Sequence, residues 1–81
     1  MVRIFECEYN YQEQIGENVD EEILSDKVNI VADNAQEVIY RLPSIVSAEN
    51  TDSFEDEETK KKIIYCRANV VAININLLAE A

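Results

Sequence analysis

The sequence predicts an α+β fold: a small antiparallel sheet of three to four strands with one helix packed on one face. Three stretches alternate between apolar and polar residues with the period of half-buried strands, and a stretch between the second and the third has the helical period. The 81 residues include only one Gly and one Pro, so we expect few breaks in regular structure. A chain of this length is expected to form a single domain, residues 1–81.

The first strand is predicted over residues 2–12. Its apolar and polar side chains alternate, with Phe5, Cys7, Tyr9 and Tyr11 on one face and Glu6, Glu8, Asn10 and Gln12 on the other. This pattern is typical of an antiparallel sheet with one packed face and one solvated face. Val2 and Ile4 interrupt the solvated face. They are either a local feature of the sheet edge or the beginning of a contact with another subunit.

Residues 13–26 are acidic and have no clear period. Asn18 and Glu21 have the spacing of a capping box, which favours a single helical turn. Equally, Gly16 is the turn of a long hairpin whose second arm merges into a strand at residues 24–32. Either way we expect the first two strands to pair, because consecutive strands usually lie side by side.

The next stretch predicts a strand that leads almost directly into a helix. Alternation over residues 27–32 turns three side chains inward: Val28, Ile30 and Ala32. The period then becomes helical, with one apolar stripe: Ala35, Val38, Ile39 and Leu42. Asp33 is expected to cap the first turn, with Gln36 at the capping-box position. Pro43 disfavours the helical conformation of Leu42 and is expected to end the helix.

After this helix, residues 44–48 are expected to form at most a short strand. Residues 49–59 are rich in Asp and Glu, and like charges at this density repel one another, so we expect a solvated acidic loop. Phe54 is the residue expected to tether that loop.

The last long strand is predicted to begin at residues 60–62. Its apolar positions alternate and then slip by one residue, first as Ile64, Cys66, Ala68 and Val70 and then as Val71, Ile73 and Ile75. A β-bulge produces such a slip, because the extra residue exchanges the two faces. Either the strand is a bent edge strand, or one half packs on the helix and the other half meets another subunit.

These elements predict one hydrophobic core, built from Phe5, Cys7, Tyr9, Val28, Ile30, Val38, Ile39, Leu42, Ile64, Cys66 and Val70. Two cysteines do not make a disulfide framework. Cys7 and Cys66 are therefore interpreted as reduced core residues, the alternative being a cross-strand pair in an oxidising compartment.

The composition argues against an enzyme. The chain has no His, which removes the commonest general base, the commonest metal ligand and the usual partner of a Ser or Cys nucleophile. One glycine cannot build a phosphate-binding loop, and neither acidic stretch has the ligand spacing of an EF-hand. The carboxylates lie in solvated runs, where nothing raises a pKa towards neutrality. We therefore expect no catalytic residue, no cofactor and no metal site.

The net charge of -10, from 17 acids against 7 bases, disfavours direct binding to nucleic acid. No apolar run approaches the ~20 residues of a membrane span, and residues 1–11 have no signal-peptide pattern, so a cytoplasmic protein is expected. The acids either keep the protein soluble or meet a protein partner with a basic surface. The candidate acids for such a contact are Glu6, Glu8, Asp20, Glu21, Glu22, Asp26, Glu49, Asp52, Glu55, Asp56, Glu57 and Glu58.

An alternative function is that of a self-associating structural or assembly protein. The end of the chain is rich in apolar residues that a lone sheet would leave exposed. The residues expected to form a homodimer contact are Val71, Ile73, Ile75, Leu77 and Leu78.

The segment from Val28 to Ile39 resembles the strand-then-helix of many small proteins from bacteriophages and mobile elements. In these, the strand ends in a small residue, an Asx or Ser caps the helix, and Ala-x-x-(Val/Ile) follows, as it does here. Several small anti-CRISPR inhibitors are similar in size, acidity and order of elements. Carboxylates on a small rigid sheet can mimic the charges of nucleic acid and occupy the basic groove of a nucleic-acid-handling protein. The resemblance favours this inhibitor interpretation and implies a phage-encoded protein that acts in the host cytoplasm. It assigns no functional residue.

Overall fold

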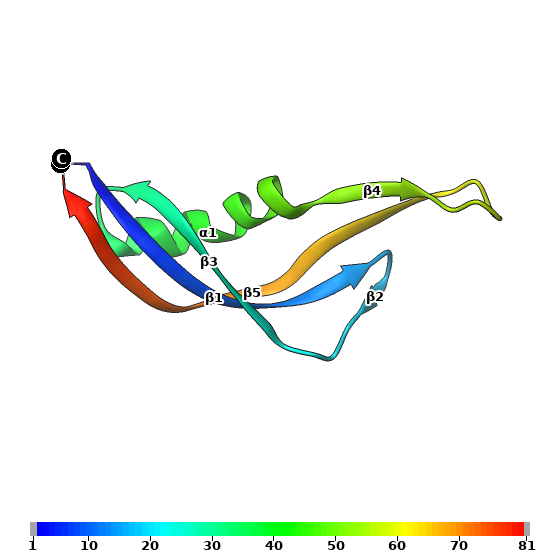
Figure 1. The fold of residues 1–81 in the computed structure, drawn as a ribbon, viewed down its shortest axis with the longest axis horizontal. Coiled ribbons are helices and arrows are strands. Elements are labelled where there is room, and N and C mark those ends of the chain that lie inside the picture. Colours follow the sequence, from blue (N-terminus) through cyan, green and yellow to red (C-terminus); the bar gives the residue numbers. More distant parts are fainter. Residues whose placement is uncertain (1, 81) are drawn as a thin grey trace.

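The structure is a computed structural model that describes residues 2–80; Met1 and Ala81 lie outside the described residues. An antiparallel sheet carries one helix on one face, which confirms the predicted α+β fold (Figure 1). The elements in chain order are β1 (Arg3–Ile15), β2 (Asn18–Val19), β3 (Leu24–Ala32), α1 (Ala35–Asn50), β4 (Asp52–Glu55) and β5 (Lys62–Glu80).

Strand β1 is the centre of the sheet. It pairs with β3 along one side and with β5 along the other, and β4 pairs with the first residues of β5. The two-residue strand β2 folds back on the end of β1, with Gly16 at φ 59° in the turn. The hairpin interpretation of residues 13–26 is therefore correct, and the helical turn at Asn18 is wrong.

The molecule is long and narrow, measuring 51 × 22 × 15 Å, with a radius of gyration of 15.2 Å. A compact domain of this length has a radius of gyration of about 12 Å. The excess arises because β1 and β5 run nearly the length of the molecule. The helix lies over one end of the sheet, and two hairpins extend from the other end (Figure 1).

The cap of α1 lies one residue later than the sequence predicted. Asn34, not Asp33, is the N-cap, and its Oδ1 accepts a hydrogen bond of 2.9 Å from the backbone N–H of Glu37. The side chain of Glu37 reaches past the N-cap, and its Oε2 accepts from the backbone N–H of Asp33 at 3.0 Å. Glu37, rather than the predicted Gln36, thus lies at the capping-box position, but its bond goes to the residue before the N-cap.

Pro43 does not end the helix, which continues for two turns to Asn50. A proline inside a helix costs roughly 3 kcal/mol. Here it lies on the exposed side of α1, while Leu42 and Val46 lie on the buried side. Burial of Val46, which continues the stripe from Leu42, offsets that cost. The prediction of a short strand at residues 44–48 is therefore wrong, because these residues belong to α1.

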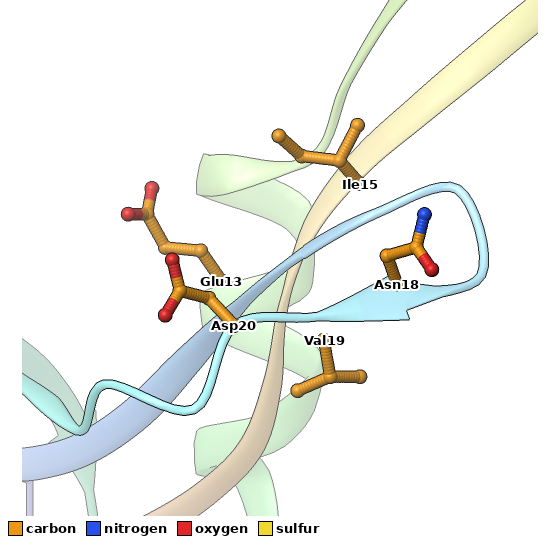
Figure 2. Close-up of a pocket in the computed structure, with 5 residues that line it drawn as sticks. All are labelled: Glu13, Ile15, Asn18, Val19 and Asp20. Carbon is orange, nitrogen blue, oxygen red and sulfur yellow. The ribbon is translucent and has the colours of Figure 1, made fainter.

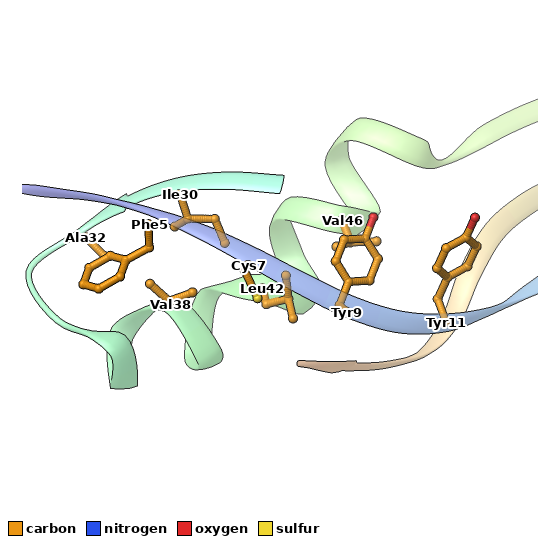
Figure 3. Packing of buried hydrophobic residues seen from close by; sticks show 9 residues of the cluster. All are labelled: Phe5, Cys7, Tyr9, Tyr11, Ile30, Ala32, Val38, Leu42 and Val46. Carbon is orange, nitrogen blue, oxygen red and sulfur yellow. The ribbon is translucent and has the colours of Figure 1, made fainter. Parts of the chain in front are cut away.

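The core lies between α1 and the adjoining face of the sheet (Figure 3). Its buried members are Phe5, Cys7, Tyr9, Tyr11, Ile30, Ala32, Val38, Leu42 and Val46. Of the predicted core residues, Val28 and Val70 pack at its margin, whereas Ile39 and Ile64 are exposed. Ile39 is exposed because the buried stripe of α1 follows every fourth residue and leaves out the i+1 position.

The predicted acidic loop at residues 49–59 is partly regular. Residues 49 and 50 end α1, and β4 then pairs with β5 in the register Asp52 to Tyr65 and Glu55 to Lys62. Only residues 56–61 connect the two strands. Phe54 does not tether this segment to the core, because its side chain is half exposed.

Strand β5 contains the predicted phase slip, but not at the predicted place. The pairing with β1 shifts at three points, and Asn69, beside one of them, has φ 53°. Val70 and Ala72 both face the core side, so the change of face occurs at Asn69, before Val70 rather than after it. Residues before this bulge are consequently reversed relative to the prediction.

This reversal accounts for two of the misplaced core residues. Ile64 and Cys66 point to the face opposite α1, where Cys66 lies across from Gln14. Cys7 faces the core instead. Both cysteines are free, and their positions on opposite faces exclude the cross-strand disulfide.

Candidate functional site

Beyond the end of α1, the side chain of Arg67 covers the sheet face that the helix leaves uncovered. Its Nη1 donates to the Tyr9 hydroxyl at 2.6 Å and to Asp26 Oδ2 at 2.7 Å. The guanidinium carbon lies 4.2 Å from the centre of the Tyr11 ring. The Arg67 side chain is only 15% exposed, whereas Asp26 is half exposed, so the guanidinium is largely desolvated but its ion pair with Asp26 is open to solvent on one side. The guanidinium also makes a cation–π contact with Tyr11.

The electrostatics of this cluster hold each member in one protonation state. Burial alone would lower the pKa of Arg67, but its hydrogen bonds to Asp26 and Tyr9 outweigh burial and raise that pKa. The hydrogen bond from Arg67 lowers the pKa of Asp26 below its usual range. Desolvation raises the pKa of Tyr9. A cationic Arg67, an ionised Asp26 and a neutral Tyr9 therefore persist at neutral pH, and none is poised for proton transfer.

One nitrogen of the Arg67 guanidinium has no hydrogen-bond partner among the described residues. This nitrogen is Nε, and it is buried. Because burial removes water from this N–H and no group in residues 2–80 replaces it, the unpaired Nε lowers the stability that the Arg67 cluster contributes.

The same face continues into the first hairpin. The Tyr65 hydroxyl donates to the Glu13 carboxylate, and this hydrogen bond raises the pKa of Tyr65. Glu13 lies opposite Asp20, whose backbone N–H donates to the Glu13 carbonyl at 2.8 Å. Two carboxylates thus project side by side.

An open hollow of about 380 Å³ lies at this hairpin, lined by Glu13, Ile15, Asn18, Val19 and Asp20. Figure 2 shows the carboxylates of Glu13 and Asp20 close together on one side of the ribbon, with Val19 directed to the other. The hollow is open to solvent and lacks the convergent polar groups of an enclosed ligand pocket.

Of the predicted acids, three lie together where the chain leaves this hairpin. Asp20, Glu21 and Glu22 are exposed in the connection from β2 to β3. The connection is fixed by Gln12, whose Nε2 donates to the carbonyls of Asp20 at 3.1 Å and Glu21 at 3.5 Å. Asp20 Oδ1 also accepts from the backbone N–H of Glu22 at 2.9 Å. These acids are therefore held in a defined geometry.

The remaining predicted acids of the chain's second half belong to the other hairpin or lead into it: Glu49, Asp52, Glu55, Asp56, Glu57 and Glu58. Asp56 shapes the turn, because its Oδ1 accepts from the backbone N–H groups of Glu58 and Thr59. Lys60, Lys61 and Lys62 lie in the same hairpin. They reduce its negative potential.

Three predicted acids lie apart from both hairpins. Glu6 and Glu8 are on the solvated face of β1, as predicted, and Glu6 lies 3.9 Å from the Lys27 ammonium. Asp26 pairs with Arg67. The structure therefore divides the predicted acids among several places.

The predicted self-association residues are also divided. Val71, Ile73, Leu77 and Leu78 are exposed, whereas Ile75 packs against the core. Ile73 and Leu78 have no partner residue on β1, because each is the extra residue of a bulge.

The Arg67 cluster was not predicted. With Ile64, Cys66 and Ala68 as the inward set, Arg67 falls on the outward face, because the predicted alternation continues through Asn69 without a break. A signal was present: Arg67 is the only charged residue between Lys62 and Glu80. A lone charge in a strand this apolar needs a partner.

Comparisons with protein-family models, with curated proteins and with solved structures found no match. Among residues 2–80, no group of three or more His, Cys, Asp or Glu side chains is placed to hold a metal ion. No helix in the described part of the chain is long and apolar enough to cross a membrane.

Proposed function

We propose that this protein is a non-enzymatic protein-interaction module whose first hairpin, residues 13–22, binds a basic surface on another protein. The observation that carries this proposal is the charge of that hairpin. It holds five acids and no Lys or Arg, and the chain has no base at all from Ile4 to Asp26. Within residues 2–80, none of the five acids forms an ion pair. Their charge is available to a partner.

The second hairpin is the weaker candidate. Residues 52–62 also contain five acids, but three lysines offset them. Glu55 lies directly across from Lys62. The attraction to a basic surface is therefore smaller than at residues 13–22.

The position and rigidity of the first hairpin support the proposal. It projects from the part of the sheet that α1 does not cover, so a partner can reach it, although the hairpin of β4 and β5 extends farther along the molecule (Figure 1). Its backbone is fixed by Gln12 and Asp20, so little conformational entropy is lost on binding. Long-range attraction from the acids speeds encounter with a basic partner.

Proteins that handle nucleic acid carry basic grooves, because they must neutralise phosphates. The partner class we propose is therefore a nucleic-acid-handling protein, which this chain inhibits by occupying its groove. The resemblance to small phage proteins agrees with a phage-encoded inhibitor that acts in the host cytoplasm.

The test is capture of purified basic-groove proteins from the native host on immobilised protein, at low and high salt. We expect capture to weaken as salt rises and to be competed by duplex DNA. A variant with Glu17→Gln, Asp20→Asn, Glu21→Gln and Glu22→Gln should lose most capture.

The matched control neutralises four acids of the second hairpin, Glu55→Gln, Asp56→Asn, Glu57→Gln and Glu58→Gln, which changes the net charge equally. We expect it to retain capture. Equal loss in both variants would assign the effect to net charge alone, and unchanged capture in the first variant would refute the role of residues 13–22.

A further inference from the structure

The outer edge of β5 is open over most of its length. β4 covers only Lys62–Tyr65, and β1 lies on the other side of β5. From residue 66 to residue 80, no strand among the described residues pairs with that edge. In Figure 1 the red-to-orange half of β5 runs along the outside of the sheet.

This edge is uncharged and apolar. Residues 68–79 contain no Asp, Glu, Lys or Arg. Val71, Ile73, Leu77 and Leu78 are each about half exposed along it. An open edge with unpaired backbone groups and apolar side chains favours pairing with another strand.

The opposite edge of the sheet, on β3, is protected. Its nine residues include the charged pair Asp26 and Lys27. The carbonyl of Val31 accepts a hydrogen bond of 2.5 Å from Arg41 Nη1. A further strand therefore has much less to gain at β3 than at β5.

The surface of the molecule is large enough to supply an interface. The accessible surface is 5760 Å². A compact folded monomer of 9.3 kDa exposes about 5000 Å², and the elongated shape accounts for the difference. This difference of roughly 800 Å² is comparable to the share that one partner contributes to an interface of standard size.

Charge selects the partner. A basic protein is attracted to the acidic hairpins rather than to the neutral edge. Two copies with a net charge of -10 each repel one another, and a neutral segment is where they can approach most closely. A second copy of this chain is therefore the occupant that fits the edge of β5.

The pattern of bulges gives the register. Asn74–Leu77 is a regular run, flanked by the bulged residues Ile73 and Leu78. We propose that two copies pair β5 with β5, antiparallel, about a two-fold axis at Ile75, because residues opposite one another in an antiparallel pair point to the same face. Ile73 of each copy then meets Leu77 of the other, and the two sheets become one continuous sheet. The contact is self-complementary, as a two-fold interface must be.

The test is the molar mass in solution, measured by light scattering after size-exclusion chromatography. We expect twice the 9.3 kDa chain mass for the wild type. Ile73→Lys should give a monomer, because it places a charge against the partner's Leu77. The matched control is Ile39→Lys on α1: Ile39 is 53% exposed and Ile73 is 47% exposed, and the charge change is the same. It should remain a dimer.

Salt and hydrogen exchange complete the test. Salt should strengthen the dimer, since it screens repulsion between acidic chains, whereas it should weaken capture of a basic partner. Amides of residues 70–79 should be protected in the wild type and exchange faster in Ile73→Lys. A monomeric wild type, a dimeric Ile73→Lys, a monomeric Ile39→Lys or open-ended assembly would each overturn the proposal. Residues 13–22 are outside the contact, so the failure of either proposal leaves the other standing.

Discussion

The face of the sheet that carries α1 has two halves, and they are covered by different means. Over the first half, Val38, Leu42 and Val46 pack on the sheet to form an apolar core. Over the second half, one guanidinium lies on Tyr11 and pairs with Asp26. The difference shows how a sheet longer than its helix can still exclude water from its aromatic side chains.

The lengths explain why two means are needed. A helix of 16 residues spans about 24 Å, whereas a strand of 13 residues spans about 43 Å. The helix therefore cannot cover the whole of β1. Arg67 has a long apolar stem and a flat charged group, so it covers an aromatic ring and still reaches a carboxylate.

The largest loss of stability is expected in the half that the helix covers. Leu42→Ala removes a side chain that is 2% exposed in the centre of the core. The lost burial and the resulting cavity should lower the free energy of unfolding by about 2–5 kcal/mol. Urea unfolding measures it. Ile39→Ala, on the exposed side of the same helix, is the control and should change stability by less than about 0.5 kcal/mol. Equal effects would contradict the packing described for α1.

The next largest loss is expected in the other half. Arg67→Ala uncovers Tyr11 and removes the donor to Asp26 and Tyr9. We expect a loss of about 2 kcal/mol, the size of a charged hydrogen bond together with lost packing. Arg67→Lys should recover only part of it, because an ammonium cannot serve both partners and lie flat on the ring. Urea unfolding of the two variants checks this order. If Arg67→Ala had the same free energy of unfolding as the wild type, the second half of the face would need no cover.

Much of this fold could be predicted from alternation alone. The inward set of β1 and the strand-to-helix change near Asp33 depend on local periods, which the sequence displays directly. The helix was wrongly predicted to end at Pro43. The local cost of a proline is visible in the sequence, whereas the burial of Val46 that offsets this cost is a tertiary effect.

The Arg67 cluster was not predictable in the same way. It depends on the bulge at Asn69, and one residue of shift reverses every side chain that precedes it. The uneven charge of the two hairpins, in contrast, was present in the sequence, because the lysines at 60–62 follow directly on the acidic run.

A smaller, pH-dependent effect is expected at Asp26, whose pKa is lowered by Arg67. A lowered pKa in the folded state contributes stability above the unfolded value of about 4, and this contribution is lost as the pH falls through the folded value. The Asp26 side chain is 47% exposed, so solvent screening limits its contribution to about 1 kcal/mol. Asp26→Asn should therefore be less stable than the wild type at neutral pH, and the two should converge below about pH 4. Denaturant titrations across this range test the convergence, and a constant difference would exclude the ion pair as its cause.

The smallest effect is expected where the covered face meets the acidic hairpin. Tyr65→Phe removes the hydrogen bond to Glu13 and leaves the ring in place. Because the pair is close to solvent, water can replace the lost donor, and the cost should be about 0.5–1 kcal/mol. Glu13 then has no protein donor and becomes fully available beside Asp20. We therefore expect Tyr65→Phe to lose a little stability and to capture a basic partner at least as well as the wild type, measured side by side. Weaker capture would mean that Tyr65 holds Glu13 in the geometry that the partner recognises.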